Sequence, residues 1–358
     1  LGANRLTGQL HLGGGTPTFL ASTDLEKLLK NLRQHFDFNT QAELGIEIDP
    51  RTLQENSLDF LADLGFNRTS FGVQDFHPEV QSAINRIQPY AMVEQAISLA
   101  RKAGFQSINT DLIYGLPKQT VQTFEQTIKA LVALRPDRIA LYNYAHLPQR
   151  FKAQRLIQAE DLPKAEERLQ IFLMAAQQLL DAGYEYIGLD HFALPTDELH
   201  LARLDQSLHR NFQGYTTRAA SDLVGLGVSA IGKVGRTHLQ NHRSLKDYTA
   251  QITQGRLATF RGYVMTDEDR LREDLIMTLM CSMPIDFHTI EQRYGVNFQS
   301  KFAAELTALQ PYIEAGLLQR TADYLQVTAK GRLFVRAISM EFDSHLRQAT
   351  QATYSKLI

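Results

Sequence analysis

The sequence predicts an α/β protein whose parallel strands form a barrel-like sheet. Two observations support this fold class. Through the first half of the 358 residues, short runs rich in apolar and β-branched residues alternate with amphipathic helical runs, which is the order typical of βα units. Each of the short runs also ends on glycine or on polar residues. In a parallel barrel the chemistry lies where the carboxyl ends of the strands open into loops, so we expect the functional site there.

The first half contains six candidate strands and five candidate helices. Thr23, with Glu26 three residues later, predicts the N-cap of the first helix. Gly65, Gly104 and Gly183 stand just past the ends of three other helices, as helix-terminating glycines do. The strands are expected at residues 9–12, 44–48, 68–73, 107–113, 138–144 and 184–189, and the helices at residues 23–35, 52–64, 90–103, 121–134 and 164–182.

The pattern changes at about residue 266. Helices are expected at residues 267–281, 286–294 and 298–314, followed by two short strands at 317–320 and 324–327 and a last helix at 330–342. Helices followed by a small hairpin resemble a winged-helix layout, but without an excess of Lys or Arg this region is expected to pack rather than to bind DNA. We therefore predict one domain over residues 1–265 and a mostly helical, winged-helix-like domain over residues 266–358.

Composition argues against several kinds of partner. The 37 Lys and Arg residues are balanced by 39 Asp and Glu, for a formal net charge of −2, so no basic field is available for nucleic acid. No window approaches the ~18 uninterrupted apolar residues of a membrane span. No signal peptide is recognisable either. We expect a monomeric, cytoplasmic protein.

Cys281 is the one cysteine of the sequence. An internal disulfide and a metal site built from several thiolates of this chain are both excluded by that count. Cys281 lies in the helical, apolar stretch LIMTLMCSM, so it is predicted to be a small core residue.

Polar residues at the predicted strand ends are candidates for the site. Glu47 stands between Ile46 and Ile48, so if the isoleucines face the helices its carboxylate points into the barrel. A charge there needs a partner, which either a ligand or an ion pair inside the barrel could supply. Asp111 presents the same pair of alternatives. The strand-end residues are Gly13 to Gly15, Glu47, Asp49, Gln74, Asp75, Asp111, Asn143, His146, Asp190 and His191.

Three of the neighbouring polar residues have simpler interpretations. Asp49, in the stretch Asp-Pro-Arg-Thr, is expected to cap the following turn. Gln74 could fill a hydrogen-bonding position as a neutral side chain. Arg86 lies outside any predicted strand, where a solvated surface charge is the usual reading.

The glycine run of Gly13 to Gly15 does not form a dinucleotide-binding fingerprint, because Thr16 and Pro17 follow it and no helix opens directly after it. Three glycines permit an extended backbone whose amides and carbonyls approach a ligand without any Cβ in the way. The alternative, a flexible turn, would need only one glycine.

Several longer stretches resemble a known family. QLHLGGGTPT, IEIDP, FGVQDF, DLIYGLPKQT and the GLGVSAIG run from Gly225 to Gly232 resemble the radical S-adenosylmethionine enzymes of haem biosynthesis. YNYAHLPQRFKAQR, DHFALPTDEL and HRNFQGYTT narrow the resemblance to the oxygen-independent coproporphyrinogen III oxidases. The resemblance runs along the whole chain.

This resemblance implies a partial (β/α)6 TIM-like barrel, with the first strand missing from this chain, and a mostly helical C-terminal domain. In such enzymes a [4Fe-4S] cluster held by three thiolates cleaves S-adenosylmethionine, of which two molecules bind. The resulting 5′-deoxyadenosyl radical starts the decarboxylation of two propionates of coproporphyrinogen III, giving protoporphyrinogen IX. An electron donor and an electron acceptor are implied as further partners.

The resemblance also implies site residues, although it assigns no catalytic residue to this chain. Gly14, Glu47, Ala145 and Ile231 match positions at the cluster-bound S-adenosylmethionine. Positions at a second molecule correspond to Gly15, Thr16, Gln74, Arg86 and Asp111. His209, Arg210 and Tyr215 could contact the propionates or the tetrapyrrole, and a packed loop is the alternative for them.

The chain departs from the family pattern in one respect. The cluster motif Cys-x3-Cys-x2-Cys should lie a few dozen residues before the glycine run, so its cysteines are expected upstream of Leu1, and no metal ligand is expected within this chain. Either the chain is part of a longer enzyme, which its start at Leu rather than Met favours, or it is a cluster-free relative. Without those cysteines we expect it to be inactive alone.

Two other functions are possible. A haem chaperone of the same family would share the GGGTP, Gln74 and Asp111 regions, whereas the YNYAHLP and HRNFQGYTT stretches favour the oxidase. A cluster-independent barrel lyase or aldolase could use Glu47 and Asp111 as acid and base, but it would need an activated lysine or a metal site at the strand ends, and neither is visible.

Overall fold

The computed structural model describes residues 6–219 and 221–348 of the chain. Its contacts divide the chain into two compact units, residues 2–200 and residues 201–357. Helix α7 (Glu198–Leu204) spans the boundary between them. The two units are described in turn.

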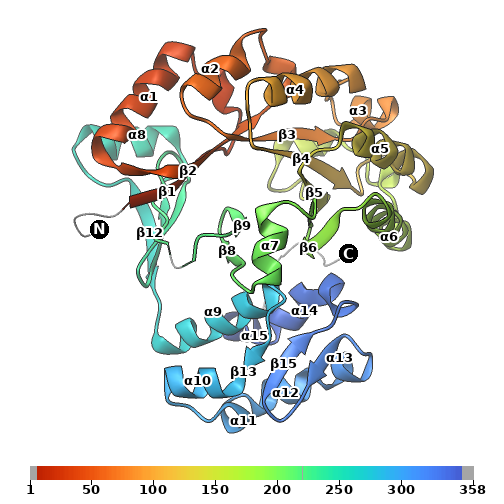
Figure 1. Ribbon diagram of the computed structural model, residues 1–358, viewed down its shortest axis with the longest axis vertical. Helices are drawn as coiled ribbons and strands as arrows, with labels where there is room; N and C mark the ends of the chain where they lie inside the picture. The colour runs from red at the N-terminus through yellow and green to blue at the C-terminus, as the bar shows by residue number, and fades with distance from the viewer. Residues whose placement is uncertain (1–5, 220, 349–358) are drawn as a thin grey trace. The chain divides into compact units, whose positions relative to one another are not determined.

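A curled half-barrel sheet of seven strands forms the first unit, in the order β1-β2-β3-β4-β5-β7-β6 (Figure 1). The first five strands are parallel, and β7 is antiparallel to both of its neighbours. The α/β class and the partial barrel expected from the sequence are confirmed. The strands are β1 (Leu6–Leu12), β2 (Asp37–Ile48), β3 (Arg68–Gln74), β4 (Ser107–Tyr114), β5 (Arg138–Asn143), β6 (Glu185–Gly188) and β7 (His191–Ala193).

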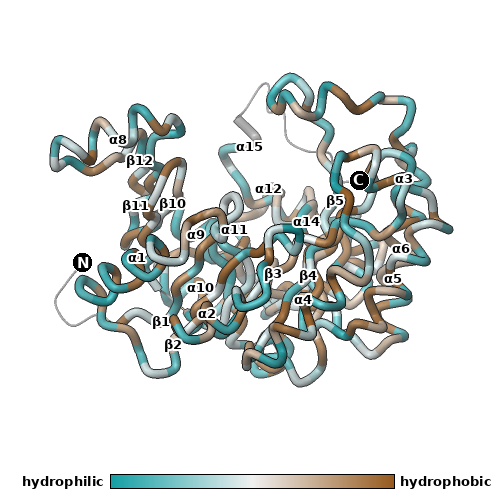
Figure 2. The backbone as a smooth tube through the Cα atoms, turned by 90° about the horizontal axis from the view of Figure 1, so that it is seen from above, coloured by the Kyte–Doolittle hydropathy of each residue, from teal (hydrophilic) through white to brown (hydrophobic). Residues whose placement is uncertain are grey.

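Helices cover the outer face of this sheet (Figure 1). They are amphipathic, and in Figure 2 the trace along α4 and α5 accordingly alternates between hydrophobic and hydrophilic residues. Their apolar stripes pack on the outward side chains of the strands in one continuous core. The helices are α1 (Ser22–His35), α2 (Ser57–Asp63), α3 (Pro78–Ala83), α4 (Tyr90–Lys102), α5 (Val121–Leu134) and α6 (Ala165–Asp181), with short 3-10 turns η1 (Pro17–Phe19), η2 (Pro50–Thr52), η3 (Lys152–Leu156) and η4 (Ala159–Asp161).

Strands β2, β3 and β4 alternate between a buried and a less buried face of the sheet. Along β2, Leu44, Ile46 and Ile48 are buried toward the helices, whereas Glu43 and Glu47 are only partly buried on the other face. Strands β3 and β4 show the same alternation. Because successive side chains of a strand point to opposite faces, the apolar outer face requires the polar residues to line the inside of the half-barrel.

Two expectations for the first unit were wrong. The first helix begins at Ser22 with Ala21 as its N-cap and no side-chain cap, so Thr23 lies inside the helix rather than capping it. Asp190 and His191 do not end a strand, because the chain turns after Gly188 and His191 opens β7, which inserts between β5 and β6. A three-residue strand is too short to show an alternating pattern in the sequence.

The second unit combines three small sheets with helices. Strands β8 (His209–Asn211) and β9 (Gly214–Thr216) form a hairpin. The other sheets have the orders β10-β11-β12 and β13-β15-β14. The remaining strands are β10 (Ile231–Val234), β11 (Thr237–Asn241), β12 (Thr259–Val264), β13 (Ile285–Asp286), β14 (Leu318–Arg320) and β15 (Tyr324–Val327).

Helices dominate the C-terminal part of this unit, as the sequence predicts. The expected helix over residues 298–314 is broken into three, and Pro311, which has no N–H to donate, stands at the start of the third. No helix among the described residues is long and apolar enough to cross a membrane. The helices are α8 (Leu245–Thr253), α9 (Asp267–Met280), α10 (Phe287–Tyr294), α11 (Phe298–Lys301), α12 (Ala303–Ala308), α13 (Gln310–Glu314), η5 (Gly331–Phe334), α14 (Val335–Met340) and α15 (Ser344–Gln348).

Candidate active site

Glu47 lies at the carboxyl end of β2 and points to the inner face of the half-barrel. Its Oε2 accepts a hydrogen bond from the backbone N–H of Gly14 at 3.2 Å, and its Oε1 lies 3.2 Å from Nε2 of His11. Burial alone would raise the pKa of Glu47, but His11 and the Gly14 N–H together hold that pKa below its ordinary value. The side chain is 42% exposed, so the carboxylate is charged and open to a ligand.

The three consecutive glycines next to Glu47 serve different purposes. A Cβ on Gly13 would come within 2.5 Å of Oε1 of Glu47 and 2.8 Å of Nε2 of His11. Gly14 has a φ of +82°, in the left-handed region that favours glycine. Positions 14 and 15 have open space where a Cβ would stand. Thr16 follows as the residue before η1, and its carbonyl accepts from the N–H of Phe19. The run therefore leaves bare backbone beside a carboxylate.

Asp111, on β4, lies on the same inner face of the sheet as Glu47. Its Oδ2 accepts from Oγ of Ser70 at 3.1 Å and its Oδ1 from Nδ2 of Asn109 at 2.8 Å. Burial, opposed by these two hydrogen bonds and reinforced by the charge of Glu47, raises the pKa of Asp111 to about 6. Sheet register explains the proximity, since Ser70 pairs with both Glu47 and Asn109. The expectation that both carboxylates point into the barrel is confirmed.

The side chains of Gln74 and Arg86 both lie close to Gly72 of β3. A Cβ at that position would come within 2.8 Å of Nε2 of Gln74 and 3.3 Å of Nη2 of Arg86. Arg86 donates to the carbonyl of Gly72 at 2.8 Å and pairs with Asp49 at 3.3 Å, so it is not the solvated surface charge that its sequence position suggests. Asp49 also accepts from the N–H of Arg51, which confirms its predicted capping role.

Two buried atoms of this pair have no partner among the described residues: Oε1 of Gln74 and Nε of Arg86. Because an unpaired buried polar atom costs free energy, these two atoms make Gln74 and Arg86 candidates for contact with a ligand.

Ala145 follows β5 in a loop that forms hydrogen bonds with the side chain of Gln154. The side-chain amide of Gln154 donates to the carbonyl of Ala145 at 3.0 Å and accepts from the N–H of Leu147 at 2.6 Å. Close by, Tyr144 and His146 share a hydrogen bond of 3.4 Å. No contact is seen within the described residues between Ala145 and the polar row of Glu47 and Asp111.

The other residues implied by the resemblance lie in the second unit. Ile231 opens β10. Arg210 and Tyr215 pair across the β8–β9 hairpin, and the guanidinium of Arg210 lies 4.9 Å from the centre of the Tyr215 ring. Tyr215 donates to the carbonyl of Met280 at 2.7 Å. Nη1 of Arg210 is buried without a hydrogen-bond partner among the described residues.

His11, Ser70 and Asn109 are site residues that the sequence analysis missed. Asn109 precedes Asp111 by two positions on one strand, so strand periodicity could have placed both on the same face. His11 and Ser70 reach the site only through the pairing of β1 and β3 with β2, for which the sequence carries no short-range signal.

The described residues provide no ligands for a metal cluster. No group of three or more His, Cys, Asp or Glu side chains in residues 6–219 and 221–348 could hold a metal ion. Cys281 is 1% exposed, which confirms its prediction as a core residue, and burial raises the pKa of its thiol to about 12. A protonated, buried thiol is not a metal ligand.

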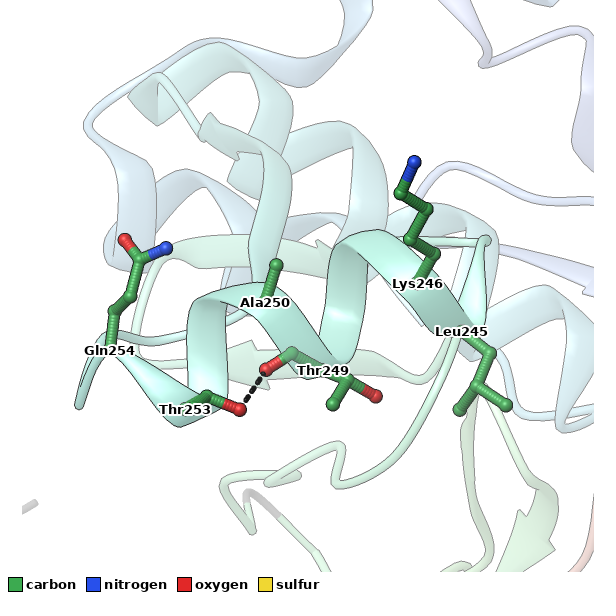
Figure 3. Close-up of a pocket in the computed structure, with 6 residues that line it drawn as sticks. All are labelled: Leu245, Lys246, Thr249, Ala250, Thr253 and Gln254. Carbon is green, nitrogen blue, oxygen red and sulfur yellow. Dashed lines mark hydrogen bonds between the residues drawn. The ribbon is translucent and has the colours of Figure 1, made fainter.

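A pocket of about 610 Å³ lies elsewhere, along α8 (Figure 3). Lys246 is the one titratable group among its lining residues, and the hydroxyl of Thr253 donates within the helix to the carbonyl of Thr249 at 2.8 Å. This pocket offers no set of converging polar groups, in contrast to the mouth of the half-barrel. It is lined by Leu245, Lys246, Thr249, Ala250, Thr253 and Gln254.

The glycine run and the two inward carboxylates lie within residues 1–131, which match the Radical SAM superfamily model. Residues 265–334 match the model of the HemN C-terminal domain. The chain is 47% identical to the oxygen-independent coproporphyrinogen III oxidase of Salmonella typhimurium over 357 residues, which cover 99% of this chain and 78% of the relative. It therefore belongs to the oxygen-independent coproporphyrinogen III oxidases, a family of radical SAM enzymes.

Other relatives agree with this assignment. The enzyme of the same name from Escherichia coli is 46% identical over 99% of this chain and 78% of its own length. A solved structure of that Escherichia coli coproporphyrinogen III oxidase, described as a radical SAM enzyme, superimposes with a TM-score of 0.93 at 46% identity, covering 95% of this chain and 79% of the other. The family implies a [4Fe-4S] cluster and S-adenosylmethionine as cofactors.

Proposed function

We propose that this protein removes two propionate carboxyl groups of coproporphyrinogen III by oxidative decarboxylation, giving protoporphyrinogen IX. The relatives that match almost the whole chain carry this activity in their name. One structural observation supports the proposal most directly: the charged carboxylate of Glu47 stands beside the bare backbone of Gly14 at the open mouth of the half-barrel. S-adenosylmethionine supplies, when bound with the cluster, the radical that starts the oxidation.

The residues at this mouth fit the amino-acid end of S-adenosylmethionine. Its ammonium group needs acceptors, and Glu47 offers a carboxylate whose lowered pKa keeps it ionised. Gly14 leaves space for close approach because no Cβ stands between ligand and backbone. We assign Gly14, Glu47 and Ala145 to one molecule.

We assign a second molecule to Gly15, Thr16, Gln74, Arg86 and Asp111. The unpartnered Oε1 of Gln74 and Nε of Arg86 offer one acceptor and one donor. Asp111 is held by Ser70 and Asn109, and with a pKa of about 6 it can accept from a ribose hydroxyl or donate when protonated.

The cluster needs three thiolates, and this sequence contains one cysteine, which is buried. We infer that the thiolates come from outside these 358 residues and that the chain alone does not decarboxylate its substrate. An electron donor and an electron acceptor complete the reaction as external partners.

For the substrate, Arg210 is the best-supported contact. Its buried Nη1 lacks a partner in the part of the chain that the structure describes, and a propionate carboxylate would complete it with a charge-assisted hydrogen bond. Tyr215 fixes the guanidinium from one side. His209 lies next to Arg210 on β8, so its side chain points to the opposite face of the hairpin, and we assign it to a different part of the tetrapyrrole.

A matched pair of variants tests the cofactor site. Glu47→Gln keeps the shape but removes the charge, and we expect the Kd for S-adenosylmethionine to rise about tenfold or more, measured by equilibrium dialysis. Glu43→Gln makes the same change four residues earlier on the same strand and face, where Glu43 lies 3.4 Å from Arg68, and should leave that Kd unchanged. Equal affinity of the wild type and Glu47→Gln would refute the assignment.

The reaction itself is tested with the protein as expressed from its gene. Reconstituted with iron and sulfide without oxygen and supplied with S-adenosylmethionine, an electron donor and an electron acceptor, it should form 5′-deoxyadenosine and release two CO2 for each coproporphyrinogen III. Binding of haem without CO2 release would instead identify a haem chaperone.

A further inference from the structure

The turn that ends β3 holds Gln74 in a strained conformation. Gln74 has a φ of +67°, a region in which residues with a side chain pay a steric cost of roughly 1 kcal/mol. The N–H of Asp75 donates to the carbonyl of Val73 at 2.9 Å and closes a three-residue turn around Gln74. Turns of this size with a positive central φ are rare and strained. Such a conformation persists only where the surrounding structure fixes it.

A buried network on the outer side of the sheet provides that fixation. Asp75 is fully buried, and its carboxylate accepts from the N–H of His77 at 2.7 Å, from Oγ1 of Thr127 at 2.6 Å and from Nε2 of Gln119 at 2.6 Å. Burial raises the pKa of Asp75 even though these three donors oppose the rise. The carboxylate thereby joins the loop after β3 to helix α5 and to the loop after β4.

Gln119 carries the connection to β4. Its Nε2 donates to Asp75 and to the carbonyl of Ile113 at 3.0 Å, while its Oε1 accepts from the N–H of Gly115 at 2.6 Å. Since the nitrogen must face Asp75 and the oxygen must face Gly115, the amide has one orientation. Gln119 is 2% exposed and cannot exchange these partners for water.

Gln81 and Gln88 extend the network to the position of Arg86. Nε2 of Gln81 donates to the carbonyls of Asp75 and Gln88, and Nε2 of Gln88 donates to the carbonyl of Gly72, which also accepts from Arg86. These buried amide side chains therefore fix the backbone next to both Gln74 and Arg86.

We propose that Asp75 and Gln119 are positioning residues that set the Gln74 turn and the β4 loop for binding of S-adenosylmethionine. Asp75 points away from the inner face of the sheet, and neither Asp75 nor Gln119 contacts that face. Their effect passes through the backbone of Gln74 and Gly115. This inference rests on the proposed cofactor site of Gln74, Arg86 and Asp111.

An exchange of donor and acceptor provides the test. Asp75→Asn sets an amide N–H2 against Nε2 of Gln119, and Gln119→Glu sets a carboxylate against that of Asp75, so each single change opposes two like groups. In the double variant Asp75→Asn/Gln119→Glu the Asn N–H2 donates to the Glu carboxylate, whose other oxygen still accepts from Gly115. The double variant has the shape and charge of the wild type, but it replaces the bond to the carbonyl of Ile113 at 3.0 Å with a contact between two oxygens, so its recovery is expected to be incomplete.

We expect each single variant to raise the Kd for S-adenosylmethionine about tenfold and the double variant to return within about threefold of the wild type, by equilibrium dialysis of the full chain. Thr69→Val is the matched control, because it removes a buried hydrogen bond of β3, from Oγ1 of Thr69 to the carbonyl of Ile46 at 3.1 Å, away from the turn. It should lower the melting temperature but leave the Kd unchanged.

The outcomes separate the two proposals. If the wild type fails to bind S-adenosylmethionine, the proposed function is wrong. If the wild type binds and a folded single variant binds equally well, the positioning role is wrong. The positioning role would also be wrong if the double variant bound no better than the single variants, or if Thr69→Val lost as much affinity. Asp75 and Gln119 would then contribute only to the general stability of the fold. Should Asp75→Asn fail to fold, Gln119→Glu and the double variant give the same comparison.

Discussion

A Cβ atom on Gly13 would stand 2.5 Å from Oε1 of Glu47. The next residue, Gly14, donates its N–H to the same carboxylate, although 33 positions separate it from Glu47 in the chain. The glycine run and the carboxylate are thus fitted to each other. The absence of a side chain at Gly13 lets Glu47 and His11 occupy the space above the backbone.

Gly13→Ala should therefore weaken binding without unfolding the protein. The new methyl meets the mobile ends of Glu47 and His11, which can rotate away, so we expect the free energy of unfolding to change by less than about 1 kcal/mol. Rotation breaks the bond from Gly14 to Glu47, and the Kd for S-adenosylmethionine should rise about tenfold in equilibrium dialysis. Undiminished affinity would show that the position of Glu47 is not critical.

Gly331→Ala, in contrast, should destabilise the folded protein. A Cβ there would stand 1.8 Å from the carbonyl oxygen of Leu317, and backbone cannot rotate away as a side chain does. We expect a loss of roughly 3 kcal/mol in chemical denaturation followed by circular dichroism. Gly316→Ala is the control, since it has a φ of +70° but open space, and should cost only about 1 kcal/mol. Similar losses in both variants would contradict the steric explanation.

Asp111→Asn should change the pH dependence of stability. Because the folded protein raises the pKa of Asp111 from 3.8 to about 6, the folded state favours the neutral carboxyl. The stability that this preference contributes is present below pH 4 and is lost as the pH rises through 6. Between pH 4 and pH 7 we therefore expect the variant to gain roughly 2 kcal/mol relative to the wild type. Urea titrations at both pH values measure this gain, and a pH-independent difference would contradict it.

Arg138→Met should destabilise the first unit strongly. Arg138 donates from Nε to Asp197 and from Nη2 to Glu198, both at 2.8 Å, and the side chain of Asp197 is only 5% exposed. Removing the guanidinium leaves a buried carboxylate without this partner, at a cost of roughly 3 kcal/mol. Lys129→Ala removes an exposed pair with Glu125 on α5 and should cost less than about 0.5 kcal/mol by the same denaturation. Comparable losses would mean that burial does not matter here.

Local sequence predicted the repeating parts of the fold well. Gly65, Gly104 and Gly183 stand past their helices with φ near +90°, since only glycine adopts that backbone without steric cost. The alternation of Ile46, Glu47 and Ile48 correctly placed the carboxylate on the inner face, because the period of a strand is fixed at two residues. Thr23 shows the limit: the helix begins at Ser22 with Ala21 as its N-cap, two residues before the N-cap that the sequence predicted.

By itself, the sequence determined the order of βα units, the faces of the strands and the bare backbone of the glycine run, since each of these follows from the residue types within a few positions. The tertiary structure alone decided that His11 pairs with Glu47, that Ser70 donates to Asp111 and that Gln119 reaches Asp75. The residues of these pairs lie 36, 41 and 44 positions apart in the chain. Strand register and the packing of loops, which depend on the free energy of the whole sheet, bring the distant ones together.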